Sequence, residues 1–143
     1  DLVRSRGLGD VYKRQLLDID HFKQINDVYG HAAGDAVLNH IARVLEQSMR
    51  AQDLVARYGG DEFVAYMRCT HEVGMQRARE IRNAIDQYAV SWNGRNIHIT
   101  VSIGLYYQDL QEGVDVNALL DNADNAMYKA KRQGRNRVVD ISH

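Results

Sequence analysis

The sequence predicts a domain of the α/β (α+β) class, in which a mixed sheet of about five strands is flanked by helices. Short apolar or β-branched runs alternate along the chain with longer segments of helical periodicity. Two glycine-containing turns, Gly59-Gly60-Asp61 and Asn93-Gly94, each separate a pair of candidate strands, so part of the sheet is expected to consist of hairpins. A length of 143 residues with 45% hydrophobic residues is sufficient for one domain with a buried core.

The N-terminal part of the chain predicts a strand and two helices after an unpatterned leader. Residues 1–15 are rich in Arg and Gly and show no sustained period, so we expect them to be loosely structured or foreign to the domain. The apolar run at 16–20 predicts a strand that ends in carboxylates. Apolar residues three and four apart predict a short helix over 22–29, which Gly30 ends, and an apolar stripe predicts the next helix over 34–50.

The rest of the chain predicts further strands and helices in alternation. We expect two strands, a helix, a strand, a helix and a strand over residues 54–58, 62–67, 72–88, 97–106, 116–131 and 137–141, with a short extra strand before Asn93. The resulting order is β-α-α-β-β-α-β-β-α-β. Strands interleaved with helices and interrupted by hairpins indicate a mixed sheet with helices packed on it.

The composition excludes several classes of function. A formal net charge of -1 gives no global field that would attract a nucleic acid polymer or an anionic membrane. Cys69 is the single cysteine, so the chain has no internal disulfide. No apolar run approaches the ~18 residues that a membrane span requires. We therefore expect this domain to contact neither nucleic acid polymers nor membranes.

Carboxylates at the end of the first predicted strand are the first candidate site. Asp18 and Asp20 are two residues apart on a strand, so their side chains are expected to share a face. Their hard oxygen donors suit Mg²⁺. Taken alone, the pattern is more typical of a strand end that is capped by solvated acids.

The glycine turn carries the second candidate site. Gly59 and Gly60 would let a phosphate approach the backbone closely, and the turn would expose amide donors. Asp61 and Glu62 follow at once, and they would repel a phosphate unless a cation lay between them. The combination indicates metal-bound phosphate, although a lone Gly-Gly-Asp is also typical of an ordinary hairpin.

Cations near both ends of the chain form the third candidate site. Lys23 follows the first strand, while Lys131 and Arg135 flank the end of the last predicted helix. They are suited to bind a triphosphate. The simpler alternative for Lys131 is that it complements the dipole at the end of the helix.

Several segments together form an ordered set of motifs. In chain order they are LDIDHFK (17–23), IND (25–27), YGH (29–31), GD (34–35), RYGGDEF (57–63), TVSIG (100–104), ADNAMY (123–128) and KRQGRN (131–136). Each is weak alone, but the set, in this order over residues 16–141, resembles the GGDEF domain family of diguanylate cyclases. The resemblance implies a palm-like fold related to class III nucleotide cyclases, with the glycine signature on a β-hairpin.

The resemblance also implies a reaction and a metal site. The enzyme would join two GTP molecules into cyclic di-GMP and two pyrophosphates. Asp18 and Asp61 would bind two Mg²⁺ ions, or Mn²⁺ in their place, with the backbone carbonyl of Ile19 completing the site. Glu62 would act as a further ligand or as the base for the 3′-hydroxyl, and the sequence does not decide between these roles.

Further residues would hold GTP according to the same resemblance. The turn amides of Gly59 and Gly60 would lie against the nucleotide. Lys131 and Arg135 would hold phosphate oxygens, helped by the backbone near Phe22 and Lys23. Asn26 and Asp35 would read the guanine edge, and Asp35 is suited to this because a carboxylate accepts from guanine N1–H and the amino group together. An acid at this position favours an enzyme that uses GTP rather than ATP.

Two properties of the assembly follow from the resemblance. One domain would hold one GTP, so catalysis would require a two-fold homodimer. The residues Arg50 and Asp53, five residues before the glycine turn, match the family's inhibitory Arg-x-x-Asp motif and would bind cyclic di-GMP as a feedback inhibitor. As a bare pattern, the same pair is typical of an arginine at the end of a helix followed by an aspartate before a strand.

The N-terminus departs from the family. Members usually begin with a segment similar to Asp-x-Leu-Thr-x-Leu-x-Asn-Arg-Arg and a helix, which residues 1–15 do not match. We therefore expect residues 16–143 to be a GGDEF domain that lacks its usual first segment. A bacterial, cytoplasmic enzyme is implied, and a membrane anchor could precede it in a longer protein.

Two alternatives remain open from the sequence. One is a catalytically impaired GGDEF domain that senses GTP or cyclic di-GMP. The other is an unrelated ferredoxin-like interaction domain that binds RNA, although the sequence has neither the basic face nor the aromatic strand motif that this requires.

Overall fold

A computed structural model describes residues 10–50, 53–57, 59–109 and 125–141. A five-stranded sheet has the order β2-β3-β1-β6-β7, and only the β6–β7 pair is parallel. Its strands are β1 (Asp10–Ile19), β2 (Leu54–Arg57), β3 (Glu62–Thr70), β6 (Val101–Asp109) and β7 (Val138–Ile141). The predicted mixed sheet with flanking helices is confirmed.

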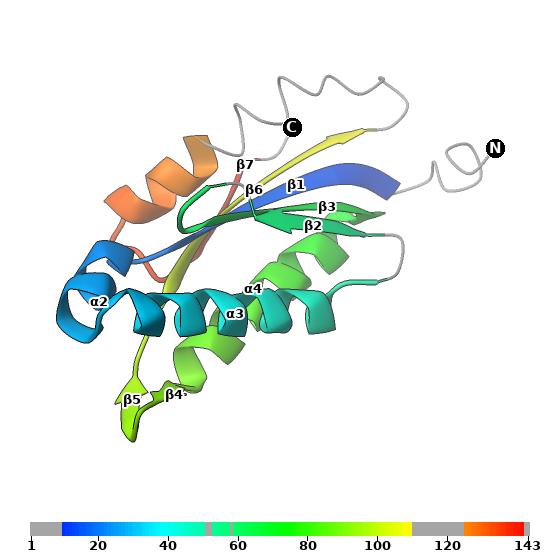
Figure 1. The fold of residues 1–143 in the computed structure, drawn as a ribbon. Coiled ribbons are helices and arrows are strands. Elements are labelled where there is room, and N and C mark those ends of the chain that lie inside the picture. The colour runs from blue at the N-terminus through cyan, green and yellow to red at the C-terminus, as the bar shows by residue number, and fades with distance from the viewer. Residues whose placement is uncertain (1–9, 51–52, 58, 110–124, 142–143) are drawn as a thin grey trace.

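Helices cover the sheet unequally (Figure 1). The long helices α3 (His31–Ser48) and α4 (His71–Gln87) pack on one face. The short helix α2 (Phe22–Tyr29) precedes α3, and Gly30, with a φ of 96°, separates the two as predicted. The described helical residues 125–132 lie beyond the opposite face of the sheet, at the same end as α2.

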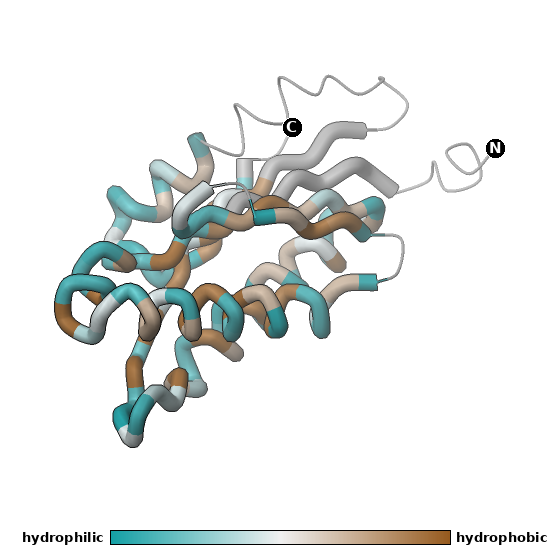
Figure 2. Tube along the Cα trace, in the orientation of Figure 1, coloured by the Kyte–Doolittle hydropathy of each residue, from teal (hydrophilic) through white to brown (hydrophobic). Residues whose placement is uncertain are grey.

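Alternation along the strands sends apolar side chains towards α3 and α4. Leu17 pairs in register with Phe63 on one side and with Ile103 on the other, and all three side chains are buried. They form one hydrophobic cluster with apolar residues of the two helices, Val37, Ile41, Leu45, Ala78, Ile81 and Ile85. Figure 2 shows apolar stretches on the strands and on the helices that face them. Burial of this apolar surface is the main source of stability.

The same register determines what lies on the other face of the sheet. Successive strand residues point to opposite faces. Asp18 pairs with Glu62 of β3 and with Ser102 of β6, one position along from the apolar row. These polar residues therefore lie on the face away from α3 and α4, and this arrangement positions the candidate site.

Two sequence predictions about element boundaries were wrong. The strand expected at 16–20 begins at Asp10, so residues 10–15 are not loosely structured; β1 is the central strand, and pairing with β3 and β6 on both edges overrides the weak local pattern. The apolar run 97–106 is split, because Ile97 ends the small hairpin of β4 (Val90–Trp92) and β5 (Arg95–Ile97) while β6 begins at Val101.

The remaining elements follow the predictions closely. The hairpins at Gly59-Gly60 and Asn93-Gly94 are both present. Residues 1–9 and the first part of the helix predicted at 116–131 lie outside the described residues. Among the helices that the structure describes, none combines the length and the apolar character that crossing a bilayer requires.

Candidate active site

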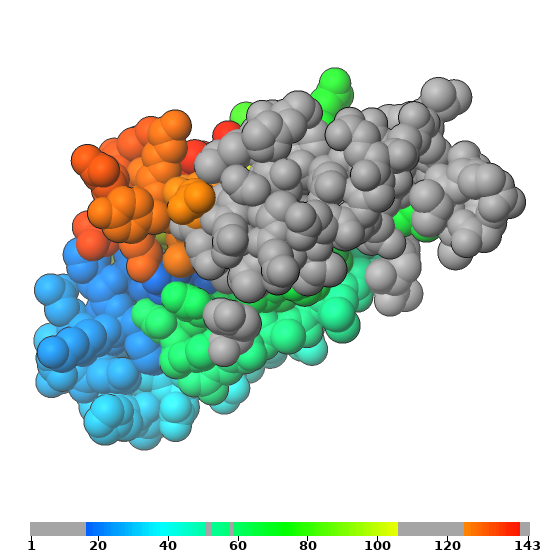
Figure 3. Space-filling model, turned by 90° about the horizontal axis from the view of Figure 1, so that it is seen from above, coloured from blue at the N-terminus to red at the C-terminus, as the bar shows by residue number. Residues whose placement is uncertain are grey.

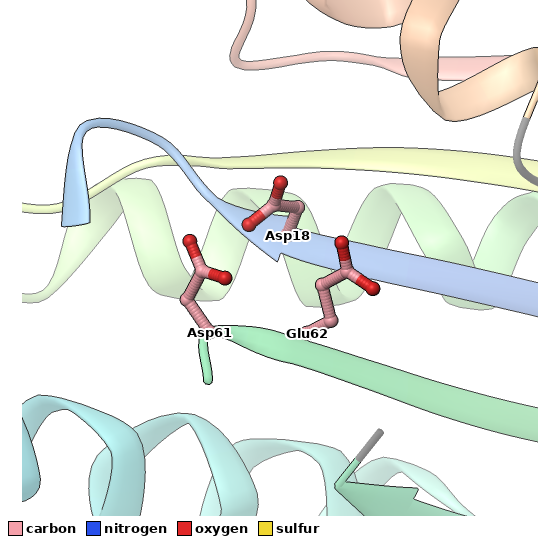
Figure 4. Close-up of side chains that lie close together, drawn as sticks. All are labelled: Asp18, Asp61 and Glu62. Atoms are coloured by element: carbon pink, nitrogen blue, oxygen red, sulfur yellow. The ribbon is translucent and has the colours of Figure 1, made fainter. Parts of the chain in front are cut away.

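Three carboxylates meet where β1 ends and β3 begins (Figure 4). Asp18 comes from β1, while Asp61 and Glu62 come from the turn and the start of β3. One oxygen from each carboxylate can be chosen so that all three lie within 4.8 Å of one another. We call these three residues the acidic cluster. It unites the first and second candidate sites of the sequence.

Backbone pairing explains why the cluster forms. Asp18 and Glu62 are register partners on neighbouring strands, so their side chains stand side by side on one face. The N–H of Ile19 donates to the Asp61 carbonyl at 3.3 Å, which ties the turn to the end of β1. The side chain of Ile19 is buried in the core, so only its backbone is available to the site.

Asp18 is in an electrostatically costly position. Its residue surface is 3% exposed, and burial raises the pKa of its carboxyl from 3.8 to about 7. This value is the net result of burial, which contributes most, of Lys131, which contacts Asp18 Oδ2 and lowers the pKa, and of the neighbouring Asp61, which raises it. Asp18 Oδ1 is buried and accepts no hydrogen bond from any described residue. A buried carboxylate oxygen without a donor, beside two further carboxylates, fits the hard oxygen ligand set of a divalent cation.

Asp20 does not belong to the cluster, despite the expectation that it would act beside Asp18. It is 4% exposed, and its carboxylate accepts from Thr100 Oγ1 at 2.6 Å, Ser102 Oγ at 2.7 Å and the Asn136 N–H at 3.0 Å. Its oxygens are therefore already used by the chain. Asp20 connects strand β6 to the turn that follows residues 125–132.

The glycine turn is open, although its backbone conformation does not require glycine. Neither Gly59 nor Gly60 has a positive φ, so backbone conformation does not require glycine there. A Cβ at either position would have no atom within 4 Å, which leaves the turn accessible to a ligand. Arg57, which sequence reasoning assigned no role, donates to the carbonyls of Gly59 at 3.1 Å and Gly60 at 2.7 Å. This guanidinium fixes the shape of the turn.

The residues expected to read guanine lie where α2 approaches α3. A Cβ at Gly34 would overlap Asn26 Oδ1 and would lie 3.3 Å from Phe22 Cζ, so glycine permits this close approach. Asp35 follows Gly34 on α3 and is exposed, as is Lys23 on α2. Asn26 therefore lies on α2 and Asp35 on α3, near the point where Gly34 lets the two helices approach each other.

The cations from the C-terminal part reach the same end of the molecule. Figure 3 shows this end, where residues after 124 lie beside α2 and the glycine turn. Lys131 contacts the acidic cluster through Asp18. Arg135 lies in the turn after the helix, exposed, with a φ of 62°.

A second group of charged residues lies near the end of α3. Asp53, with a fully buried side chain, accepts from the Arg50 N–H and from Arg77 Nη1, both at 2.8 Å, and Arg50 Nη2 is 3.6 Å from its other oxygen. We call Arg50, Asp53 and Arg77 the arginine cluster. Arg77 was missed from the sequence because it comes from α4, 24 residues further along the chain than Asp53.

Comparisons with known proteins agree on one family. The family model described as "Diguanylate cyclase, GGDEF domain" matches residues 14–137. Diguanylate cyclase A of Treponema denticola is 40% identical over 127 residues, which cover 87% of this chain and 33% of that protein. Diguanylate cyclase DgcP of Pseudomonas aeruginosa is 42% identical over 136 residues, covering 94% of this chain and 20% of that protein.

A solved structure shows the same likeness in three dimensions. The GGDEF domain of DgcB from Caulobacter crescentus, crystallised in complex with c-di-GMP, is similar with a TM-score of 0.86 and 31% identity. The match covers 97% of this chain and 82% of that chain. By contrast, the chain spans only 33% and 20% of the length of the two curated relatives.

Proposed function

The chain belongs to the GGDEF domain family of diguanylate cyclases, and on this premise we propose that it condenses two GTP molecules into cyclic di-GMP and two pyrophosphates. The names of its relatives support this class of enzyme. The observation that carries the proposal is the acidic cluster, in which a buried carboxylate oxygen, Asp18 Oδ1, accepts no hydrogen bond from the described residues and lies beside two further carboxylates.

The acidic cluster is suited to the divalent metal that the family implies. Asp18, Asp61 and Glu62 would hold it, with the Ile19 carbonyl as a backbone ligand, and we expect two Mg²⁺ ions per site. When bound, the ions stabilise charge on the triphosphate and favour ionisation of the 3′-hydroxyl. Lys131, which contacts Asp18, would then be released from this carboxylate to bind phosphate oxygens.

The residues around the cluster would hold and orient GTP. The open turn at Gly59 and Gly60 leaves room for the nucleotide against the backbone. Asn26 and Asp35 would accept and donate along the guanine edge. The exposed Arg135 would contact the triphosphate, together with the backbone near Phe22 and Lys23.

The chemistry needs two copies of the site. The 3′-hydroxyl oxygen of each GTP forms a bond to the α-phosphorus of the other, and at each phosphorus the bond to pyrophosphate breaks, which gives cyclic di-GMP and two pyrophosphates. Pyrophosphate leaves with the electron pair, and the hydroxyl proton passes to Glu62 or to solvent. Since the described residues contain one acidic cluster, two chains related by a two-fold axis would align the two GTP molecules.

The arginine cluster is suited to bind the product. Arg50 and Arg77 carry two guanidinium groups against the single carboxylate of Asp53, so this region has surplus positive charge. Guanidinium groups bind phosphates in a planar, two-pronged manner and stack on bases. We propose that cyclic di-GMP binds here and inhibits the enzyme. Unchanged product inhibition in an Arg50→Ala variant would remove this part of the proposal.

The test is to incubate the purified chain with GTP and Mg²⁺ at high protein concentration and to look for cyclic di-GMP and pyrophosphate by chromatography. The Asp61→Ala, Glu62→Ala double variant should make neither product. Glu80→Gln is a matched control, because Glu80 is an exposed acid on α4 whose hydrogen-bond partner is Gln76. It should retain full activity.

Each outcome of this experiment is informative. Product from the unaltered chain and the control alone supports the cyclase. GTP binding without product would assign the chain to the sensor role instead. An absence of GTP binding would overturn both roles. The bacterial relatives and the GTP substrate favour a reaction in the bacterial cytoplasm.

A further inference from the structure

The turn after residues 125–132 has an unusual backbone. Gly134, Arg135 and Asn136 have consecutive φ values of 117°, 62° and 47°. Glycine adopts this left-handed region freely and asparagine does so more often than most residues, whereas arginine rarely does. Two such residues in succession persist where surrounding contacts fix them, and such strain is often found at functional sites.

Contacts from three directions fix Asn136. Its backbone N–H donates to Asp20 Oδ2 at 3.0 Å. Its side-chain oxygen accepts from Arg82 Nη1 at 2.8 Å, and its side-chain nitrogen donates to Asp86 Oδ2 at 3.4 Å. Asp20 directly follows β1, and the other two belong to α4, so the turn is anchored to the end of a strand and to a helix at once.

The anchored turn also sets the end of the helix that carries Lys131. The Arg135 N–H donates to the Ala130 carbonyl at 3.0 Å, and the Gly134 N–H donates to the Lys131 carbonyl at 3.3 Å. Lys131 in turn contacts Asp18. Both cations are therefore positioned by a turn whose anchor, Asp20, is two residues from a member of the acidic cluster.

We infer that Asp20 and Asn136 are positioning residues that hold Lys131 and Arg135 in register with the acidic cluster for the triphosphate. This role rests on the proposed function, because it requires a triphosphate at the site. It assigns different tasks to two neighbouring buried acids: Asp18 serves the cluster, and Asp20 holds the cations that face it. Neither positioning residue needs to touch the reacting atoms.

The first test compares a triphosphate with a monophosphate in the Asn136→Ala variant. The probes are 3′-deoxy-GTP, which lacks the attacking hydroxyl, and GMP, both with Mg²⁺. We expect the Kd of 3′-deoxy-GTP to rise about tenfold, the order of one lost charge-assisted contact, and the Kd of GMP to stay within about twofold. Asn83→Ala is the matched control, because Asn83 also contacts Arg82 but not the turn.

A double-variant cycle tests whether Asn136 acts through a cation. If it positions Arg135, the Arg135→Ala, Asn136→Ala pair should lose less triphosphate affinity than the two single losses combined. Additive losses, or equal losses for GMP and 3′-deoxy-GTP, would overturn the inference. Asn136→Gly tolerates the positive φ and loses both side-chain hydrogen bonds, so it serves if the alanine variant does not fold.

A measurement without nucleotide separates this inference from the proposed function. Acylation of lysines, followed by mass spectrometry, should label Lys131 severalfold faster in Asn136→Ala than in the unaltered chain. Lys129, exposed on the same helix, is the internal control and should not change. If the unaltered chain binds no nucleotide, the proposed function fails, and an unchanged Lys131 rate in the variant would independently overturn the positioning role.

Discussion

The acidic cluster and the arginine cluster both contain a buried aspartate, but the charges around the two carboxylates differ in sign. Asp53 Oδ2 accepts hydrogen bonds from the Arg50 N–H and from Arg77, and Asp53 Oδ1, which accepts no hydrogen bond from the described residues, lies 3.6 Å from Arg50 Nη2. Asp18 has a single cation, Lys131, and two neighbouring acids, and its Oδ1 accepts no hydrogen bond from the described residues.

This difference distinguishes a structural carboxylate from a ligand carboxylate. A buried charge is stable only when it is paired and hydrogen-bonded. Asp53 has two guanidinium neighbours within the chain, and the cluster around it keeps surplus positive charge for an anion. Asp18 has only one cation beside it and two further carboxylates, so the acidic cluster carries negative charge that the chain does not neutralise. An added cation would neutralise it.

The largest expected effect is on activity. Asp61→Asn keeps the shape of the side chain and removes its charge, so we expect product formation to fall about 10²–10³-fold through loss of electrostatic stabilisation. Arg50→Ala should stay within about twofold when product is kept low. Initial rates of pyrophosphate release measure both. If both variants lost the same activity, the acidic cluster would not be the catalytic site as distinct from an inhibitory site at the arginine cluster.

The next effect is on stability at the arginine cluster. Asp53→Asn leaves the buried side of the two guanidinium groups without a carboxylate, and we expect it to lower the free energy of unfolding by about 3 kcal/mol. Urea unfolding followed by circular dichroism measures this. Glu80→Gln on the exposed side of α4 should change it by less than about 0.5 kcal/mol. A loss as small as that of the control would show that Asp53 is not the structural carboxylate of the pair.

The same change from aspartate to asparagine should have the opposite effect on stability at Asp18 of the acidic cluster. Burial raises the pKa of Asp18 to about 7, above its ordinary 3.8, so the folded state binds this proton more tightly than the unfolded state. The group therefore contributes stability below pH 3.8 that is lost as the pH rises through about 7. At pH 8 without divalent cations, Asp18→Asn should raise the free energy of unfolding by roughly 1–2 kcal/mol.

The pH dependence of unfolding provides the check. Between pH 5 and pH 8, with a chelator present, the unaltered chain should lose more stability than Asp18→Asn does. Saturating Mg²⁺ should narrow the difference at pH 8, because a cation that binds only the folded chain stabilises it. If Asp18→Asn destabilised the fold as Asp53→Asn is expected to, the contrast between the two clusters would be wrong.

Local patterns were sufficient for most of the fold. Period-2 and helical spacing, with Gly30 and the two hairpin turns, predicted the elements because these signals act within a few residues. They failed at residues 10–15, where the sequence DVYKRQ has no strand pattern and the strand is fixed by partners 50 or more residues away in the chain, such as Thr70 opposite Asp10. Strand pairing between residues so far apart in the chain cannot be predicted from the local spacing of apolar residues.

In the candidate active site too, local features were predicted and long-range contacts were not. Asp18, Asp61 and Glu62 were identified because their chemistry and motifs are local to two short segments. Asp20 was grouped with Asp18 as a possible Mg²⁺ ligand on spacing alone, and Arg57 and Arg77 were given no role. The carboxylate of Asp20 accepts hydrogen bonds from Thr100, Ser102 and Asn136, which lie 80 or more residues away in the chain. A residue type indicates what a side chain can bind, and only the fold determines whether the chain already supplies that partner.

The smallest expected effect concerns the surplus charge of the arginine cluster. Arg77→Lys keeps the positive charge beside Asp53 but replaces the planar guanidinium with a single ammonium, which cannot make a two-pronged contact with phosphate. We expect the inhibition constant of cyclic di-GMP to rise about threefold, with activity at low product unchanged. Inhibition of the initial rate by added cyclic di-GMP measures this, and Arg79→Lys, at an exposed arginine on the same helix, is the control. If Arg77→Lys and the control give the same inhibition constant, Arg77 does not bind the product. Arg77 would then only pair with Asp53, and Arg50 would be the single residue of the arginine cluster that binds cyclic di-GMP.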